Sequence, residues 1–358
     1  VLDPQRVDGL PRVALSWCRG RERARETGCA HVAAAVRRGR VRRALGLVAR
    51  LAGRLVAGRA GLVRGRGPVG LAVIAALKLK TEFLHVETMF LSPLRKAAPV
   101  MILANPRVTT PAQAKASGKP VVFLLGNIHP PEPEAAEALM LLARDLAVGP
   151  RKALLDKVIV MIAPVYNVDG CLNRQASSRV NQLGPEQFGF RANGRNLDLN
   201  RDFIKCDSLA AQAFNRFFTA WDPAVMVDTH TSNGADYQYT MTLIHTQSDK
   251  LGDGLGPFLR DTMLPAIYQA MDQRGWPTCP YVNPVKITPD DGIEDFLEVP
   301  RFSTGYAALH HTIGFTQRDL HQPAPAGATA ASTGIGPVGG AVRGTKQPLT
   351  GVVKEAVG

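Results

Sequence analysis

Two histidines and one glutamate stand where they could bind a metal ion. His129 and Glu132 are separated by Pro130 and Pro131, and His230 lies far along the chain. A histidine and a carboxylate three residues apart can point to one site when they lie between a strand and a helix. With a second histidine they form the two-histidine, one-carboxylate set of catalytic zinc sites, which leaves one coordination position open. Such an ion would lower the pKa of its bound water to ~7 and polarise a carbonyl group.

The segments around these residues predict a sheet that places them at one edge. Residues 121–125 are apolar throughout, as in a buried strand, and His129 follows shortly after them. A helix is expected next, with Pro131 in its first turn. Residues 224–227 predict another strand, which leads directly to His230. Ligand sites of open α/β sheets lie beyond the carboxyl ends of the strands, so both histidines are expected at the same edge.

The alternation of strands and helices predicts an α/β fold with a mixed, largely parallel central sheet flanked by helices. Other strands are expected over 100–104, 158–165 and 312–315, and another helix over 209–218. We expect three regions. They are an Arg-rich segment without a stable core (1–77), the main domain (78–315) and a low-complexity tail (316–358).

The positive charge is concentrated at the beginning of the chain. Residues 1–66 contain sixteen Arg, no Lys and four acidic residues, and carry +12 of the net +13. Three interpretations remain open: an arm for nucleic acid or a membrane surface, a targeting segment, or sequence without a designed fold. GC-rich DNA translated outside its true frame has a similar composition. The rest of the chain is nearly neutral, so nucleic acid is not an expected partner of the main domain.

Neither a membrane span nor a disulfide framework is expected. The best apolar run, Val69–Leu77, is shorter than the ~18 residues that a membrane helix needs. The five cysteines are odd in number and none has metal-knuckle spacing, so scattered free thiols are expected. They are Cys18, Cys29, Cys171, Cys206 and Cys279.

Four motifs, in order, resemble the zinc carboxypeptidase family. The family pattern is His-x-x-Glu, then Asn-Pro-Asp-Gly, then Asn-Arg within an Asp-x-Asn-Arg motif, then a third ligand His. The chain has His129-Pro130-Pro131-Glu132, Asn167-Val168-Asp169-Gly170, Asp198-Leu199-Asn200-Arg201 and Asp228-Thr229-His230-Thr231. Val168 replaces the usual proline. The resemblance extends over roughly residues 98 to 315.

The resemblance implies which residues bind the metal and the substrate. His129, Glu132 and His230 would bind one zinc ion per chain. Asn200 and Arg201 would bind the free α-carboxylate of a substrate, a task that suits the fixed fork of donors on a guanidinium.

The resemblance also implies an activity. Arg191 would polarise the scissile carbonyl, and Asp198 would orient a ligand histidine. The implied protein is a zinc-dependent metallocarboxypeptidase that removes C-terminal residues from peptides. Its partner would be a peptide or small amide with a free carboxylate, and its location extracellular or periplasmic.

The family's general base, a Glu on a late strand, has no counterpart at the expected position. Arg318 stands there, and no Glu occurs between Glu298 and Glu355. Asp319 is one residue out of register and would point to the other face of a strand. Two explanations are open. Either the protein lacks the base, or the reading frame shifts near Phe315, since the codons permitted for this segment include ones that, displaced by one base, encode Glu-Thr at this point.

Three other functions remain open at this stage. One is an amidase or deacylase of the same fold that acts on N-acyl amino acids. Another is a zinc- or peptide-binding protein without activity, and a third is nucleic-acid binding through residues 1–66. Any of four tyrosines could supply a phenol that closes over the substrate: Tyr237, Tyr239, Tyr281 and Tyr306.

Overall fold

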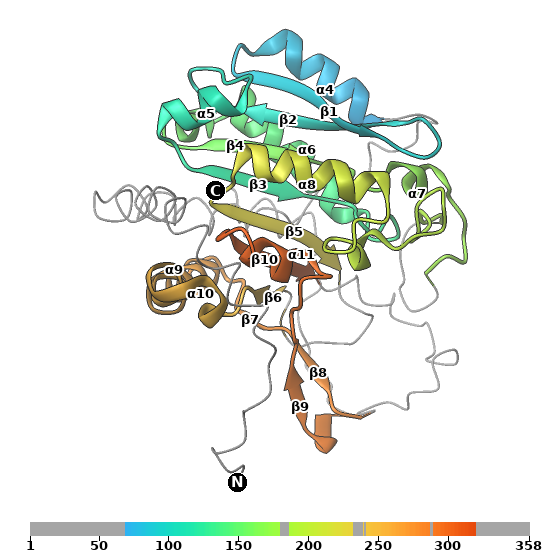
Figure 1. Cartoon of the computed structure of the whole chain (residues 1–358), viewed down its shortest axis with the longest axis vertical. Helices are drawn as coiled ribbons and strands as arrows, with labels where there is room; N and C mark the ends of the chain where they lie inside the picture. Colours follow the sequence, from blue (N-terminus) through green and yellow to red (C-terminus); the bar gives the residue numbers. More distant parts are fainter. Residues whose placement is uncertain (1–68, 180–185, 232–238, 240, 287–288, 320–358) are drawn as a thin grey trace, which may run out of the picture. The chain divides into compact units, whose positions relative to one another are not determined.

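An eight-stranded mixed sheet forms the centre of the fold (Figure 1). The computed structural model describes residues 69–179, 186–231, 239, 241–286 and 289–319. The strand order is β1-β2-β4-β3-β5-β10-β6-β7. The strands are β1 (Leu84–Leu91), β2 (Ala97–Leu103), β3 (Val121–Leu125), β4 (Ile159–Ala163), β5 (Val225–Thr231), β6 (Met241–His245), β7 (Thr278–Pro280) and β10 (Ile313–Asp319).

The four central strands β4, β3, β5 and β10 are parallel, and β6 also pairs parallel with β7. The pairs β1–β2, β2–β4 and β10–β6 are antiparallel. The fold is therefore the mixed, largely parallel α/β sheet that the sequence predicts. Every residue of β3 and β4 is buried, as expected for central strands with both faces covered. A separate two-stranded sheet pairs β8 (Val282–Pro284) with β9 (Ile293–Asp295).

Helices cover the sheet. One face packs against α8 (Leu209–Trp221) and α11 (Ser303–Ala308), whose Phe214, Phe218 and Tyr306 join Phe123 of β3 in one apolar cluster. The amphipathic helix α6 (Glu134–Ala147) contacts β2 and β5. The remaining helices are α4 (Val69–Lys80), α5 (Pro111–Ser117), α7 (Val168–Leu172), α9 (Gly252–Phe258) and α10 (Leu264–Asp272). Among the described residues, no helix is long and apolar enough to cross a membrane.

Two boundaries differ from the predicted ones. Helix α4 lies partly within the segment 1–77, and its buried Ile74 and Leu77 pack it onto the domain. The rest of that segment lies outside the described residues. Strand β10 runs to Asp319, beyond the predicted end at Phe315, because its last residues pair with both β5 and β6. The tail after residue 319 lies outside the described residues.

The described cysteines, Cys171, Cys206 and Cys279, are free thiols, whereas Cys18 and Cys29 lie outside the described part of the chain.

Candidate metal centre

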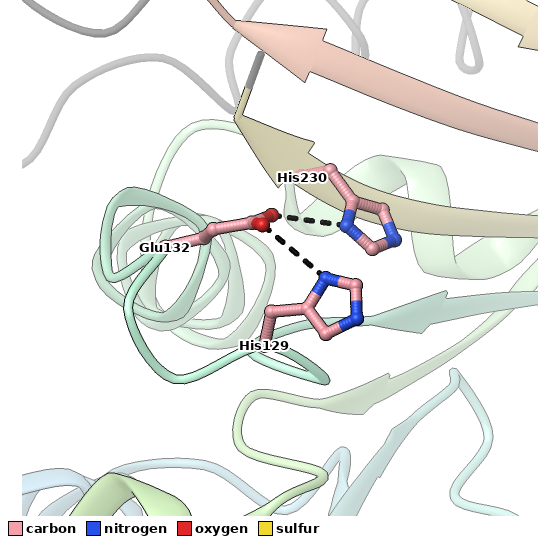
Figure 2. Close-up of side chains that lie close together, drawn as sticks. All are labelled: His129, Glu132 and His230. Atoms are coloured by element: carbon pink, nitrogen blue, oxygen red, sulfur yellow. Dashed lines mark hydrogen bonds and ion pairs between the residues drawn. The ribbon is translucent and has the colours of Figure 1, made fainter. Parts of the chain in front are cut away.

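The three expected metal ligands converge at the carboxyl ends of β3 and β5 (Figure 2). His129, Glu132 and His230 are buried, and one ligand atom from each lies within 4.8 Å of the others. The Nδ1 atom of His129 is 3.2 Å from Oε1 of Glu132. The Nδ1 atom of His230 is 3.0 Å from Oε2 of the same carboxylate. Both imidazoles therefore present Nδ1 to a single point beside Glu132.

A tight turn after β3 brings His129 and Glu132 together. Asn127 adopts a left-handed backbone conformation (φ 55°), which asparagine tolerates better than most residues. Its side-chain amide donates to the carbonyl of Glu132 at 3.1 Å, and the Glu132 amide donates to the carbonyl of His129 at 2.9 Å. Helix α6 begins only at Glu134. The prediction of Pro131 in the first helical turn was wrong, because this turn occupies residues 129–132.

A carboxylate holds the outer nitrogen of each histidine. Asp198 Oδ1 lies 3.2 Å from Nε2 of His129, and Asp228 Oδ2 lies 2.9 Å from Nε2 of His230. Such partners fix the tautomer and leave the other ring nitrogen free to ligate a metal. The resemblance implied the role of Asp198. Asp228 was missed, although its place two residues before His230 on one strand puts it on the same face.

Glu132 is held as an ionised ligand. Burial alone would raise its pKa, but the adjacent His129 and His230 lower it well below its usual range. Arg179 Nη1 lies 2.8 Å from Oε1, and the backbone amide of Thr231 donates to Oε2 at 3.0 Å. Arg179 lies in a loop without periodicity, so no sequence signal pointed to it.

His230 is more basic than an ordinary histidine. Its burial lowers the pKa, but Asp228 and Glu132 outweigh that effect and raise it to about 9. Two carboxylates on opposite sides of the ring thus favour a positive charge at this point. A bound cation would supply that charge in place of the proton.

The residues fit a zinc ion. The Nδ1 atom of His129 is buried, and although it lies 3.2 Å from Oε1 of Glu132 it forms no well-aligned hydrogen bond with any described residue. A buried polar atom without a partner is costly, and a cation at this point would satisfy it. Two imidazole nitrogens and one carboxylate oxygen are the protein ligands of many catalytic zinc sites.

The Asn167-Val168-Asp169-Gly170 motif positions Arg191. The Asn167 side chain caps α7 and donates to the carbonyl of Arg191 at 3.0 Å. A Cβ atom on Gly170 would lie 2.2 Å from the carbonyl oxygen of Phe190, so only glycine allows this approach. Arg191 Nε in turn lies 2.9 Å from Oδ2 of Asp198. The motif therefore connects a loop to the carboxylate that holds His129.

Asn200 and Arg201 lie beside His230 in a short 3₁₀ turn (Leu199–Arg201). One end of the Asn200 amide is 3.4 Å from Nε2 of His230, and the other end has no hydrogen-bond partner among the described residues. Arg201 donates from Nη1 to the carbonyl of Asn200, and its guanidinium lies 4.7 Å from the ring centre of Phe302. Both residues expected to bind a carboxylate thus lie next to a metal ligand.

Arg318 lies on the same face of the sheet as the metal ligands. In the parallel pairing of β10 with β5, Arg318 is opposite His230 and Thr316 is opposite Asp228. Paired residues of neighbouring strands point to one face, and Ser303 confirms this face by contacting both Asp228 and Thr316. A guanidinium therefore extends from the strand position directly beside His230.

No described glutamate replaces the missing base. Glu298, the last Glu before β10, is buried and paired with Lys250, and it accepts the backbone amide of Gln247 at 2.8 Å. Gln247 follows the end of β6 that lies beside Phe315. His230 instead pairs with Arg318, farther along β10. The side chain of Asp319 lies outside the described part of the structure.

The tyrosines are placed differently from one another. Tyr306 is buried in the core, and its hydroxyl donates to the side chain of Asn215. Tyr281 is buried with its ring 4.5 Å from the guanidinium carbon of Arg318. Tyr239 is exposed, and Tyr237 lies outside the described residues. Among the described tyrosines, only Tyr239 therefore has an exposed ring.

Comparisons with known proteins agree with this geometry. Residues 102–238 match the family model described as zinc carboxypeptidase. Carboxypeptidase D of Mus musculus is 37% identical over 93 residues, which cover 24% of this chain and 7% of that protein. Carboxypeptidase 2 of Trichophyton rubrum is 28% identical over 111 residues, which cover 30% of this chain and 18% of that protein. The chain thus spans only a small part of these relatives.

A solved structure shares the fold. The metallo-carboxypeptidase from Pseudomonas aeruginosa superposes with a TM-score of 0.51 at 13% sequence identity, covering 72% of this chain and 60% of that one. At this identity the likeness concerns the fold alone. Together with the ordered motifs and the converging side chains, the match over residues 102–238 makes this chain similar to the zinc carboxypeptidase family.

Proposed function

We propose that this chain is a zinc-dependent hydrolase of the metallocarboxypeptidase class, which acts at the C-terminal end of peptides. His129, Glu132 and His230 would hold one zinc ion. The observation that carries the proposal is the convergence of these three buried side chains, with the Nδ1 atoms of both histidines facing the Glu132 carboxylate. A bound zinc ion supplies Lewis acidity, since it polarises a carbonyl and makes water more acidic.

The protein's own residues would bind and orient the substrate. Asn200 and Arg201 lie beside His230, where they can bind the free carboxylate of a terminal residue. Arg191 is fixed through Nε by Asp198, and 39% of its side chain is exposed. Its remaining guanidinium N–H groups are therefore available to stabilise negative charge that develops on a carbonyl oxygen.

Proton transfer is the step for which the described residues provide no base. A guanidinium stays protonated and cannot accept a proton from water, and Arg318 occupies the strand position beside His230. We therefore propose that hydrolysis by this chain is slow. The same feature favours a second candidate function, a zinc-dependent binding protein for peptide ends that has no activity.

The substitution Arg318→Glu tests the proposal. General acid–base catalysis contributes ~10²–10⁴-fold to a reaction rate. A carboxylate beside His230 is therefore expected to raise the rate of hydrolysis at least ~100-fold for a peptide whose C-terminal residue has an uncharged side chain. The measurement is product release by the zinc-loaded full chain, with Arg318→Gln as the matched control that removes the charge without adding a base. An N-acyl amino acid assayed in parallel separates a deacylase from a carboxypeptidase.

Two results would contradict the proposal. A chain that binds no zinc cannot be this kind of hydrolase. If Arg318→Glu binds zinc and remains as slow as Arg318→Gln, a binding protein is the better description. The nucleotide sequence across codons 312–320 provides an independent check, because a shifted frame that encodes Glu there would restore the base without any substitution.

A further inference from the structure

A cluster of arginines surrounds the place where a substrate carboxylate would bind. Arg191, Arg301 and Arg318 all lie close enough to Arg201 to affect its ionisation. Burial lowers the pKa of the Arg201 guanidinium, and charge repulsion from these three arginines lowers it further, against the opposing effect of Asp198. Four guanidinium groups are more than one terminal carboxylate needs.

Among the residues that the structure describes, three of these arginines have no carboxylate partner. Within the described part of the chain, Arg191 forms an ion pair with Asp198, whereas no ion pair involves Arg201, Arg301 or Arg318. The Nε atom of Arg318 is moreover buried without a hydrogen-bond partner among the described residues. Repulsion between like charges, together with an unsatisfied buried donor, is costly. An anionic ligand would relieve both costs.

Aromatic rings hold these arginines in place. The guanidinium carbons of Arg201 and Arg301 each lie 4.7 Å from the ring centre of Phe302. The guanidinium of Arg318 lies 4.5 Å from the ring centre of Tyr281. A guanidinium that contacts an aromatic ring through its flat face keeps its N–H edge free to bind a carboxylate with two hydrogen bonds.

We infer that the site is built for a ligand with two acidic groups, namely a peptide or N-acyl amino acid whose terminal residue is Asp or Glu. The α-carboxylate would bind Asn200 and Arg201, and the side-chain carboxylate would bind Arg318, with Arg301 adding attraction from the exposed side. This inference rests on the proposed function. It also accounts for the guanidinium of Arg318 at the strand position where the family has its catalytic glutamate.

Binding of two matched ligands tests the inference on the unmodified protein. N-benzoylglycyl-glutamate and N-benzoylglycyl-glutamine have nearly the same shape and differ in one charge. Isothermal titration calorimetry on the zinc-loaded full chain is expected to show ~10- to 100-fold tighter binding of the glutamate ligand, the range expected for charge-assisted hydrogen bonds. The preference should shrink as the salt concentration rises.

Substitutions then locate the preference. Arg318→Gln is expected to remove most of the preference for the glutamate ligand over the glutamine ligand, and Arg301→Gln is expected to remove a smaller part of that preference. Arg144→Gln on the surface of α6, where the arginine pairs with Asp145, is the matched control and should leave it unchanged. Equal affinity for the two ligands, or a preference unchanged in both Arg318→Gln and Arg301→Gln, would overturn this inference alone. Failure of both ligands to bind the zinc-loaded chain would overturn the proposed function as well.

Discussion

The ends of two neighbouring strands, β5 and β10, differ in what they contribute to the site. At the end of β5, His230 has a carboxylate on each ring nitrogen and lies with His129 and Glu132 in a group that could hold a metal ion. At the end of β10, Arg318 supplies a guanidinium that has no ion pair with a described carboxylate. The candidate metal ligands and the position expected for the base belong to different segments of the chain, so one set can be complete while the other is lacking.

The contrast also concerns electrostatics. Asp198, Asp228 and Glu132 surround the two candidate ligand histidines, and their negative charges favour a cation. A few residues away, the arginines favour an anion. This separation suits a ligand that presents a polarisable carbonyl to the metal and its acidic groups to the arginines.

Removing a metal ligand should have the largest effect. His129→Ala deletes one of the three candidate ligands. Loss of a residue that hydrogen-bonds a ligand lowers metal affinity ~10- to 100-fold, and loss of the ligand itself is expected to lower zinc affinity by much more. Metal content of the purified full chain, measured by mass spectrometry, should fall from one zinc per chain to near background. His85→Ala is a suitable control, because His85 lies on β1 and pairs only with Glu87 among described residues. If the zinc content of His129→Ala equals that of the unmodified protein, His129 is not a metal ligand and the proposed metal site is wrong.

Loss of an outer partner should have an intermediate effect. Asp198→Asn keeps the shape but removes the charge that faces Nε2 of His129. Zinc affinity is expected to fall ~10- to 100-fold, as measured by competition with a chelator of known affinity. Asp261→Asn is the matched control, since Asp261 is exposed and paired only with Arg260 among described residues. An affinity equal to that of the control would mean that Asp198 does not orient the ligand.

A change in the motif that packs against the loop carrying Arg191 should have the smallest effect. Gly170→Ala places a Cβ atom 2.2 Å from the carbonyl oxygen of Phe190, so the loop must shift. The free energy of unfolding is expected to fall by ~1–3 kcal/mol, as for overpacked sites, in urea denaturation of the full chain. Gly254→Ala on α9 has nothing within 4 Å of its new Cβ atom and should not destabilise the protein. Equal stability of the two variants would show that the motif does not constrain this loop.

Much of the sheet could be predicted because β3 and β4 are short, wholly apolar runs. Residues 121–125 were predicted as a strand with the bounds that β3 has, and the helix and strand that contain Phe214 and Met226 were placed within a few residues. Boundaries were less certain where polar residues continue a strand. Thr316 and Gln317 do not look apolar, yet both are buried because β10 pairs on both sides.

The sequence by itself determined the candidate ligands His129, Glu132 and His230, and the absence of a glutamate at the position of Arg318, because these follow from residue types and their order. Only the tertiary structure decided which groups surround them. Arg179 reaches Glu132 from a loop, and Phe302 brings Arg201 and Arg301 together across a hundred residues of chain. These contacts depend on strand register and loop path, which set distances that spacing along the chain does not contain.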